Sequence, residues 1–156
     1  HRSNGLAHCA YGTDFQYDEA VLTGRGFKGR ASAVALASAL GGFMAAASVA
    51  PLRTMLERFV LPAHGEGPSP EAQRKGFFDM RFFGRTADDR TLRSRVTGDR
   101  DPGYGSTAKM LGQAAACLAL DVPETPGGFW TPATLLGERL LERLSAHSGL
   151  RFEVLD

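Results

Sequence analysis

The chain has 156 residues, of which 43% are hydrophobic and 22% charged, a composition ordinary for one soluble globular domain. Its formal net charge of +1 gives no electrostatic basis for a nucleic-acid-binding surface, and no nucleic-acid partner is expected. Cys9 and Cys117 have no second cysteine or histidine at metal-ligand spacing, so the sequence predicts neither a disulfide framework nor a metal site. The chain opens on His1 without a signal-like apolar region, and we expect a cytoplasmic domain cut from a longer protein.

Two strands are predicted at the start of the chain, over residues 1–11 and 14–22, and the second alternates between two sets of side chains. Gly24, Gly26 and Gly29 then match the pattern G-x-G-x-x-G of dinucleotide-binding proteins. That interpretation needs a buried strand before the pattern, and a further strand with an acid about 20 residues on. Because a second helix follows instead, the pattern favours a flexible, arginine-bearing connector.

Residues 31–52 contain no charged side chain and predict a helix. Leu36, Leu40, Phe43 and Met44 fall on one stripe of this helix, which favours a helix buried in a soluble core. The stretch is also just long enough to span a bilayer, and helices with small-residue faces suit membranes. Contact with a membrane or an acyl chain is therefore the alternative.

A second helix is predicted from Pro51, followed by a loop over 62–70 and a short helical turn that ends near Gly76. A hairpin comes next, with its turn at residues 87–89 and with phenylalanines on both faces of its first strand. The later elements are a small-residue helix, a loop over 123–128, a helix ended by Gly149, and a final strand. The expected fold is one α+β domain over 1–156, in the order β-β-α-α-β-β-α-α-β, with helices on a largely antiparallel sheet of about five strands.

Half of the residues in the helix predicted at 103–120 are glycine, alanine or serine. Asp101 is expected to cap it and Pro102 to occupy its first position. Interior glycines each cost a helix about 1 kcal/mol, so they need a compensating reason. The usual reason is that another backbone or a flat ligand approaches the helix closely.

The start of this helix also predicts a seat for an anion or a cofactor phosphate. Arg100 precedes it, and Ser106, Thr107 and Lys109 lie in its first turns. A phosphate-loop interpretation is rejected, because Tyr104-Gly105 stands where that motif requires Lys-Ser/Thr. The plainer alternative is that Asp99 and Arg100 pair with neighbours while Asp101 only caps the helix.

Three stretches carry a family resemblance: RSNGLAHCAYGTDFQYDEAVLTGRG (2–26), GFFDMRFFGRT with RVTGDRDPGYGSTAKMLGQAAACLALD (76–86, 95–121), and GGFWTPATLLGERLLERL to GLRFEVL (127–155). Together they resemble the C-terminal part of saccharopine dehydrogenase-like oxidoreductases, nearest to the branch that includes mycobacterial trans-acting enoyl reductases. In such proteins a Rossmann domain comes first, and an α+β domain closes over the nicotinamide. The resemblance thus implies NADP or NAD, bound mainly by an upstream Rossmann domain that is absent from this chain.

The resemblance further implies a small-molecule or acyl substrate, a possible homodimer, and no activity for this chain alone. Tyr104 and Lys109 are the candidate catalytic residues, with Tyr104 lining the pocket or donating a proton. Arg100, Ser106, Thr107 and Asn4 are the candidate substrate-binding residues; Arg100 or Lys109 would clamp a carboxylate or phosphate. The rival interpretations are a non-enzymatic lipid- or membrane-associating module that uses helix 31–52, and an interaction domain that binds through its phenylalanine strand.

Overall fold

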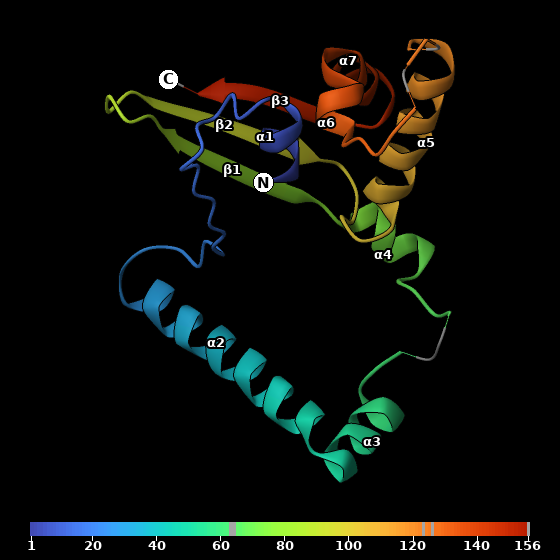
Figure 1. Ribbon diagram of the computed structural model, residues 1–156. Coiled ribbons are helices and arrows are strands. Elements are labelled where there is room, and N and C mark those ends of the chain that lie inside the picture. The colour runs from blue at the N-terminus through green and yellow to red at the C-terminus, as the bar shows by residue number, and fades with distance from the viewer. Residues whose placement is uncertain (63–64, 123, 126, 156) are drawn as a thin grey trace. The chain divides into compact units, whose positions relative to one another are not determined.

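The computed structural model describes residues 1–62, 65–122, 124–125 and 127–155 (Figure 1). The predicted loops over 62–70 and 123–128 therefore lie partly outside the described residues. The chain is α+β, as expected, with a three-stranded antiparallel sheet. The elements are α1 (Arg2–Leu6), α2 (Gly26–Ser48), α3 (Ala50–Phe59), α4 (Pro70–Lys75), β1 (Phe78–Arg85), β2 (Thr91–Gly98), α5 (Gly105–Leu120), α6 (Pro132–Leu135), α7 (Gly137–His147) and β3 (Leu150–Leu155).

The chain forms two compact units. Unit 1 comprises His1–Phe15 and Pro68–Asp156, and it contains the sheet with α1 and α4 to α7. Unit 2 comprises Gln16–Gly67 and contains α2 and α3. The chain thus leaves unit 1 after Phe15 and returns to it at Pro68, so unit 2 is an insertion.

The predicted hairpin is confirmed. β1 pairs antiparallel with β2 from Phe78 opposite Gly98 to Arg85 opposite Thr91. Its turn uses Asp89 in the left-handed region, with φ of 60°, and Arg90 donates from Nε to Asp88 at 2.7 Å. The predicted final strand is also confirmed as β3, which pairs antiparallel with the other edge of β2.

The two faces of the sheet differ in chemistry, because directly paired residues share a face. One face carries apolar side chains from all three strands: Phe78, Met80, Phe82, Leu92, Val96, Phe152 and Val154. The other face carries a row of charges, in which Arg95 donates to Asp79 at 2.9 Å and lies 3.6 Å from Glu153. Met80, Leu92 and Val154 on the apolar face are exposed, so the described residues of unit 1 leave that face largely uncovered.

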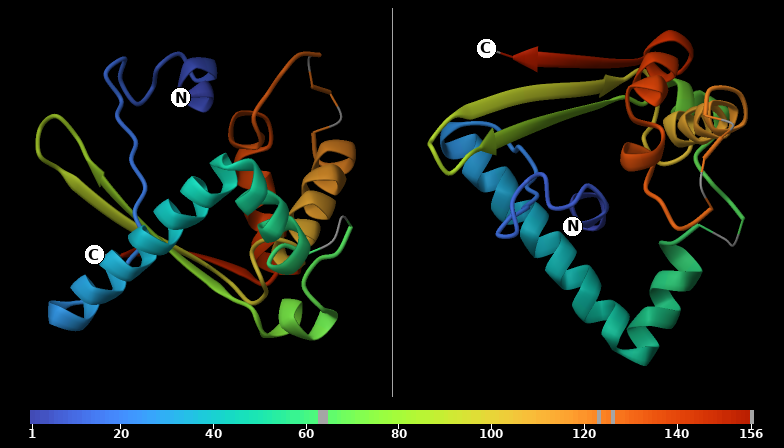
Figure 2. Two further views of the ribbon diagram at one scale, coloured as in Figure 1. Left: turned by 90° about the horizontal axis from the view of Figure 1, so that it is seen from below. Right: turned by 45° about the horizontal axis from the view of Figure 1, so that its top comes forward.

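The core of unit 1 lies where α5 and α7 pack together beside the start of β3, at one end of the sheet (Figure 2). Among the described residues, the buried hydrophobic side chains are Cys117, Leu136, Leu144 and Leu150. This is a small core for the surface that the sheet and helices present. Unit 1 therefore offers more apolar surface than its own described side chains cover.

The two predicted N-terminal strands are wrong. Residues 2–6 form α1, and the chain then turns through His8 and Cys9, both with positive φ. Asn4 holds this turn, because its side chain donates to the Gly12 carbonyl at 2.7 Å and accepts from the Tyr11 amide at 2.9 Å. Residues 14–22 alternate in character but pair with no strand among the described residues, and alternation without a partner does not make a strand.

Several helix boundaries also differ from expectation. The uncharged stretch 31–52 is divided between α2 and α3 at Val49, whose backbone is extended with φ of −105° and ψ of 116°. The helix predicted before Gly149 is divided into α6 and α7 by Gly137, which has φ of 47°. Side chains of α2 that were expected in a core are exposed, including Leu36 and Leu40. The other described residues of unit 2 thus do not bury α2.

Gly98 allows β2 to pass under the Phe78 ring, because a β-carbon at position 98 would overlap that ring. We expect Gly98→Ala to destabilise the protein by about 1–3 kcal/mol through overpacking, measured as the free energy of unfolding in urea. Gly84→Ala is the matched control within the same hairpin, since its β-carbon would meet Leu92 at an ordinary 3.9 Å. Equal losses in the two variants would contradict the packing argument.

Candidate functional site

The loop between β2 and α5 is organised by the carboxylate of Asp101. It accepts hydrogen bonds from the backbone amides of Gly103 at 3.1 Å, Tyr104 at 2.9 Å and Gly105 at 2.7 Å. These bonds, the one from Gly105 foremost, hold the pKa of Asp101 below its ordinary value. The predicted N-cap and first helical position are therefore wrong, because α5 begins at Gly105, Tyr104 is its N-cap and Pro102 lies outside it; Asp101 instead binds the Gly105 amide from the preceding turn.

This arrangement bears on the predicted anion seat. The three amides that would bind an external anion already donate to a carboxylate of the chain itself. Asp99 also has a partner, because Lys109 Nζ lies 3.3 Å from its Oδ1. The plainer alternative is therefore met in part, because Asp101 holds the amides before and at the start of the helix and Asp99 is paired, whereas the Arg100 guanidinium has no hydrogen bond or ion pair with the described residues.

The Asp101 loop is clamped against α4. The Asp101 amide donates to the Gln73 carbonyl at 3.0 Å, and a β-carbon at Gly76 would lie 2.5 Å from Asp101 Cα. Gly105 allows a close but less extreme approach, since a β-carbon there would lie 3.1 Å from Arg100 Cβ. Glycines at both positions let α4, the loop and the start of α5 pack backbone to backbone.

Three of the candidate substrate-binding residues use their side chains inside the fold. Ser106 is fully buried and its hydroxyl donates to the Arg100 carbonyl at 3.2 Å. The hydroxyl of Thr107 donates to the Pro102 carbonyl at 2.6 Å. Asn4 is buried in the turn at the N-terminus, in a different part of unit 1 from the Asp101 loop. Their roles toward a substrate stay predictions.

Lys109 is half-buried on the side of α5 that faces the end of α7. Its ammonium lies 3.3 Å from Asp99 Oδ1 and 3.4 Å from the Ser148 carbonyl oxygen. Gly149, with φ of 71°, lies so close to the Asp99 carboxylate that a β-carbon would be 2.5 Å from Oδ1. A shallow cavity of about 460 Å³ lies beside this pair, lined by Thr97, Gly98, Asp99, Ser145, Gly149, Leu150 and Arg151.

Tyr104 and Arg100 are the candidate residues whose side chains are not engaged by the described parts of the chain. The Tyr104 side chain is 55% exposed, and its hydroxyl makes no hydrogen bond with the described residues. Arg100 is half-buried, and its guanidinium likewise has no hydrogen bond or ion pair with them. Both precede the first turn of α5, so the structure brings two polar groups with unused hydrogen-bonding capacity to the same helix end.

One face of α5, here called the α5 stripe, is open beyond Tyr104. It consists of side chains that recur every three or four residues and are all exposed: Ala108, Leu111, Gly112, Ala115, Leu118 and Ala119. A β-carbon at Gly112 would meet no atom within 4 Å. Bulky side chains from the described part of unit 1 do not fill this surface, and Leu111 is 70% exposed on it.

The C-terminal end of α5 carries a polar cluster that the sequence analysis missed. Arg143 of α7 donates two hydrogen bonds to Asp121, one of them from Nη2 at 2.9 Å, and this pairing lowers the pKa of Asp121. Burial, and then the Asp121 carboxylate, raises the pKa of the Cys117 thiol, which argues against Cys117 as a nucleophile. An open cavity of about 540 Å³ adjoins the cluster, lined by Asp121, Val122, Glu124, Thr125, Trp130, Thr134 and Leu135.

The described residues do not fit a dinucleotide cradle. Gly24 before α2 and Gly26 at its first position have positive φ, and Gly29 packs against the Gly24 carbonyl. Residues 16–25 form no strand, however, so the strand–turn–helix geometry that holds a pyrophosphate is missing there. Within the described ranges, no three histidine, cysteine, aspartate or glutamate side chains are grouped closely enough to hold a metal ion.

The hydrogen bonds to the Asp101 carboxylate make the free energy of unfolding of unit 1 depend on pH in the acid range. Because the pKa of Asp101 lies below its ordinary value of 3.8 in the folded state, its ionised form stabilises the fold above about pH 4. That contribution is lost as the pH falls through the folded-state pKa. We expect Asp101→Asn to flatten the acid side of a plot of unfolding free energy against pH, measured by urea denaturation.

Asp14→Asn is the control for this measurement, because Asp14 is an exposed aspartate of unit 1 whose carboxylate accepts no hydrogen bond from the described residues. An acid dependence that stays the same in Asp101→Asn would show that the cap does not couple to folding.

The sequence of the chain is similar to part of some longer known proteins. No protein-family model matches the chain, and no solved structure matches it. The chain is 33% identical over 150 residues to a Mycobacterium tuberculosis protein provisionally named a trans-acting enoyl reductase, which covers 93% of this chain and 36% of that protein. It is 34% identical to the trans-acting enoyl reductase of Mycobacterium ulcerans over 149 residues, covering 92% and 35% of the two chains. The chain spans about a third of the length of these relatives, and it is similar over nearly its whole length to a part of a larger enoyl reductase-like protein.

Proposed function

We propose that the chain is the C-terminal, substrate-closing part of a saccharopine dehydrogenase-like oxidoreductase that uses NADP or NAD. Its similarity to part of the trans-acting enoyl reductases supports this assignment. The reaction class proposed is reduction of an enoyl group on a small-molecule or acyl substrate in the cytoplasm. The described residues do not fit a dinucleotide, so we assign cofactor binding to a Rossmann domain in the rest of the longer protein. On this proposal the chain alone is inactive.

The observation that carries the proposal is the open α5 stripe next to Tyr104. Glycine and alanine at 108, 112, 115 and 119 let a second backbone or a flat ring approach α5 closely. Leu111 and Leu118 would gain about 1.5–3 kcal/mol each if such a partner fully buried them. An exposed apolar helix face of this kind, with Tyr104 and Arg100 at the N-terminal end of the helix, suits one wall of a binding site whose other walls come from another domain.

The candidate residues divide into two groups on this proposal. Tyr104 and Arg100 face the substrate: the tyrosine hydroxyl donates a proton, and the guanidinium holds a carboxylate or phosphate of the substrate. Lys109 does not contact the substrate on this proposal and instead supports the structure around the site, because its ammonium is held by Asp99 and by the Ser148 carbonyl. Ser106 and Thr107 keep the first turn of α5 in place through their bonds to the backbone.

A second candidate function, a non-enzymatic module that associates with lipid, has a separate observation in its favour. Of the helices in the described residues, α2 is long and apolar enough to cross a membrane, and most of its side chains are exposed. Because α2 belongs to unit 2 and the Asp101 loop to unit 1, this surface is compatible with an enzymatic role for unit 1.

The first test of the enzymatic proposal uses the longer protein that contains this chain, assayed for NADPH and NADH oxidation with enoyl thioesters and α-imino acids. We expect turnover that falls by about 100-fold or more in Tyr104→Phe, because general acid catalysis contributes about that much. Tyr17→Phe is the matched control, since Tyr17 is as exposed, at 58%, but lies in unit 2. Equal activity in Tyr104→Phe and Tyr17→Phe would overturn the catalytic role of Tyr104.

A second variant tests the α5 stripe. We expect Gly112→Leu to keep or raise the stability of α5, since a helix-interior glycine costs about 1 kcal/mol, and at the same time to lower kcat/KM about tenfold or more by blocking close approach. Ala146→Leu, at an exposed position of α7, is the control. Full activity in Gly112→Leu would show that nothing packs closely against the stripe.

A further inference from the structure

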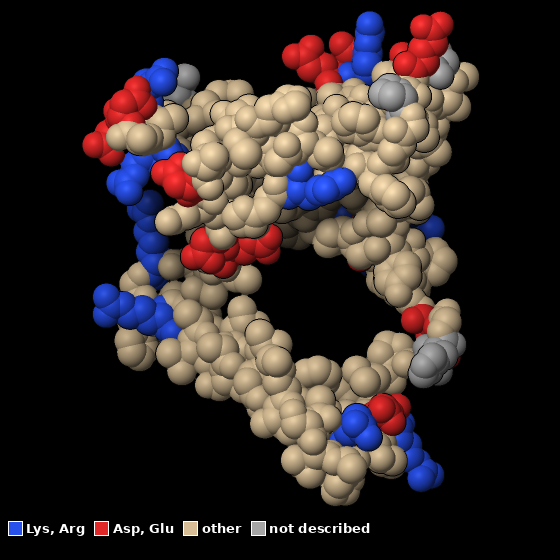
Figure 3. All heavy atoms as spheres, viewed as in Figure 1, with Lys and Arg blue, Asp and Glu red and all other residues tan. Residues whose placement is uncertain are grey.

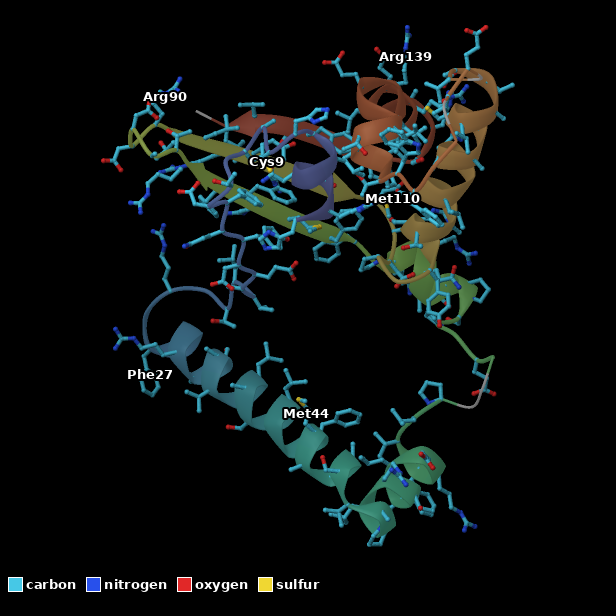
Figure 4. All side chains as sticks on the ribbon, in the orientation of Figure 1. Cys9, Phe27, Met44, Arg90, Met110 and Arg139 are labelled. Atoms are coloured by element: carbon cyan, nitrogen blue, oxygen red, sulfur yellow. The ribbon has the colours of Figure 1, made fainter. Side chains whose placement is uncertain are left out.

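The surface of unit 2 that most needs a partner is α2. The helix has 23 residues, about 34 Å at 1.5 Å per residue, and Gly29 is its one buried position among those described. Phe27 is 87% exposed, Leu40 60% and Met44 63%. Phe27 and Met44 project from different sides of the helix (Figure 4), and the middle of α2 shows neither basic nor acidic atoms (Figure 3). A helix that is apolar on every side is stable only when it is surrounded by an apolar environment.

The charges around α2 indicate which environment this is. Arg25, Lys28 and Arg30 lie at its first turn, and no acidic residue occurs anywhere in residues 20–56. A basic helix end without acids complements the anionic headgroups of a bilayer. A protein partner would cover one face of α2, whereas acyl chains surround a helix on all the sides that are apolar here.

The polar side chains next to this apolar surface are satisfied within the helices. The Ser48 hydroxyl donates to the Met44 carbonyl at 2.8 Å, and the Thr54 hydroxyl donates to the Ala50 carbonyl at 3.1 Å. Such bonds back to the preceding turn are how hydroxyls are accommodated where no water is present. They lower the cost of moving the end of α2 and the start of α3 out of water.

α3 has a different character from α2, because it is amphipathic. Its apolar positions Leu52, Met55 and Phe59 recur at helical spacing, while Arg53 pairs with Glu57 at 3.9 Å on the polar side. The Arg58 guanidinium lies 5.5 Å from the centre of the Phe59 ring, so a cationic group is held next to an apolar one. A helix with these two sides lies at a boundary between water and an apolar phase.

The path of the chain rules out a simple membrane crossing. Ser3 Oγ lies 3.0 Å from Thr131 Oγ1, and Arg2 donates to the Phe129 carbonyl at 3.1 Å, so the segments before and after unit 2 belong to one folded body. If α2 crossed a bilayer, the chain would have to cross back before Pro68. α3 is only 10 residues long and carries Arg53, Glu57 and Arg58, which makes it too short and too charged to do so.

We propose that unit 2 is a monotopic membrane-docking hairpin that binds the surface of an anionic bilayer. α2 lies within one leaflet, Arg25, Lys28 and Arg30 contact the lipid phosphates, and α3 lies at the surface with its charged side toward water. Unit 1 stays on the aqueous side. This assignment is independent of the reaction that unit 1 supports.

Flotation of the purified 156-residue chain with lipid vesicles tests the proposal. We expect the chain to float with vesicles of phosphatidylcholine containing about 30% phosphatidylglycerol, whose anionic headgroups give the vesicle a negative surface potential, and to bind pure phosphatidylcholine far less. Leu40→Asp should weaken binding on the order of tenfold or more, because it removes an apolar side chain that the bilayer would bury on this proposal. Arg30→Gln should weaken it about fivefold, and added salt should weaken the wild-type protein similarly.

Two control variants in unit 1 match these substitutions. Leu92→Asp changes a leucine that is 59% exposed, against 60% for Leu40, and Arg85→Gln removes an exposed arginine. Neither should alter flotation. Failure of the wild-type chain to float, or flotation that Leu40→Asp leaves unchanged, would overturn the proposal. So would a soluble dimer, seen by size-exclusion chromatography, that Leu40→Asp dissociates, because α2 would then be covered by a second copy.

A depth measurement separates docking from crossing. Leu36→Trp in a Trp130→Phe background places one tryptophan near the middle of α2. We expect its fluorescence to be quenched most by lipids brominated near the headgroup. Strongest quenching by bromines at the ends of the acyl chains would instead place the middle of α2 at the bilayer centre and overturn the monotopic arrangement.

Discussion

The structure of unit 1 depends on the capture of one carboxylate by three backbone amides. Asp101 binds two amides just before α5 and the amide of its first residue, Gly105, and its own amide donates to the carbonyl of Gln73 in α4. The hairpin, the short helix and the small-residue helix therefore meet at a single residue. Because α5 leaves this junction in a defined direction, its inner face packs on α7 and its outer face is presented to whatever lies beside it.

Elements set by local patterns were predictable, and elements set by distant contacts were not. The hairpin could be identified because its alternation and the turn at residues 87–89 lie within a few residues of each other, and the last strand has the same local signal. The strand prediction for the first 22 residues was wrong for two reasons. The alternating residues 14–22 have no partner strand among the described residues, and before them the Asn4 side chain bonds to Gly12 and Tyr11 and so holds a turn. The small-residue helix was located, but its start was placed too early because a cap can act from a preceding turn.

The candidate site shows the same division. A helix start with Arg100 and Tyr104 could be read from residues that are adjacent in the chain. The pairing of Asp121 with Arg143 could not, since 22 residues and a change of helix separate them. That the three amides at the helix start were already taken by Asp101 is likewise a fact of three-dimensional geometry. The sequence suggests which groups gather there, and the fold decides which of them stay free.

The environments of Cys117 and Cys9 determine which of the two thiols an oxidant modifies. Peroxides and disulfides attack the thiolate form of cysteine, and attack requires access to the sulfur. Cys117 is fully buried with a raised pKa, whereas Cys9 is exposed on the N-terminal turn. Oxidative damage would therefore modify the turn that Asn4 holds and spare the packing between α5 and α7.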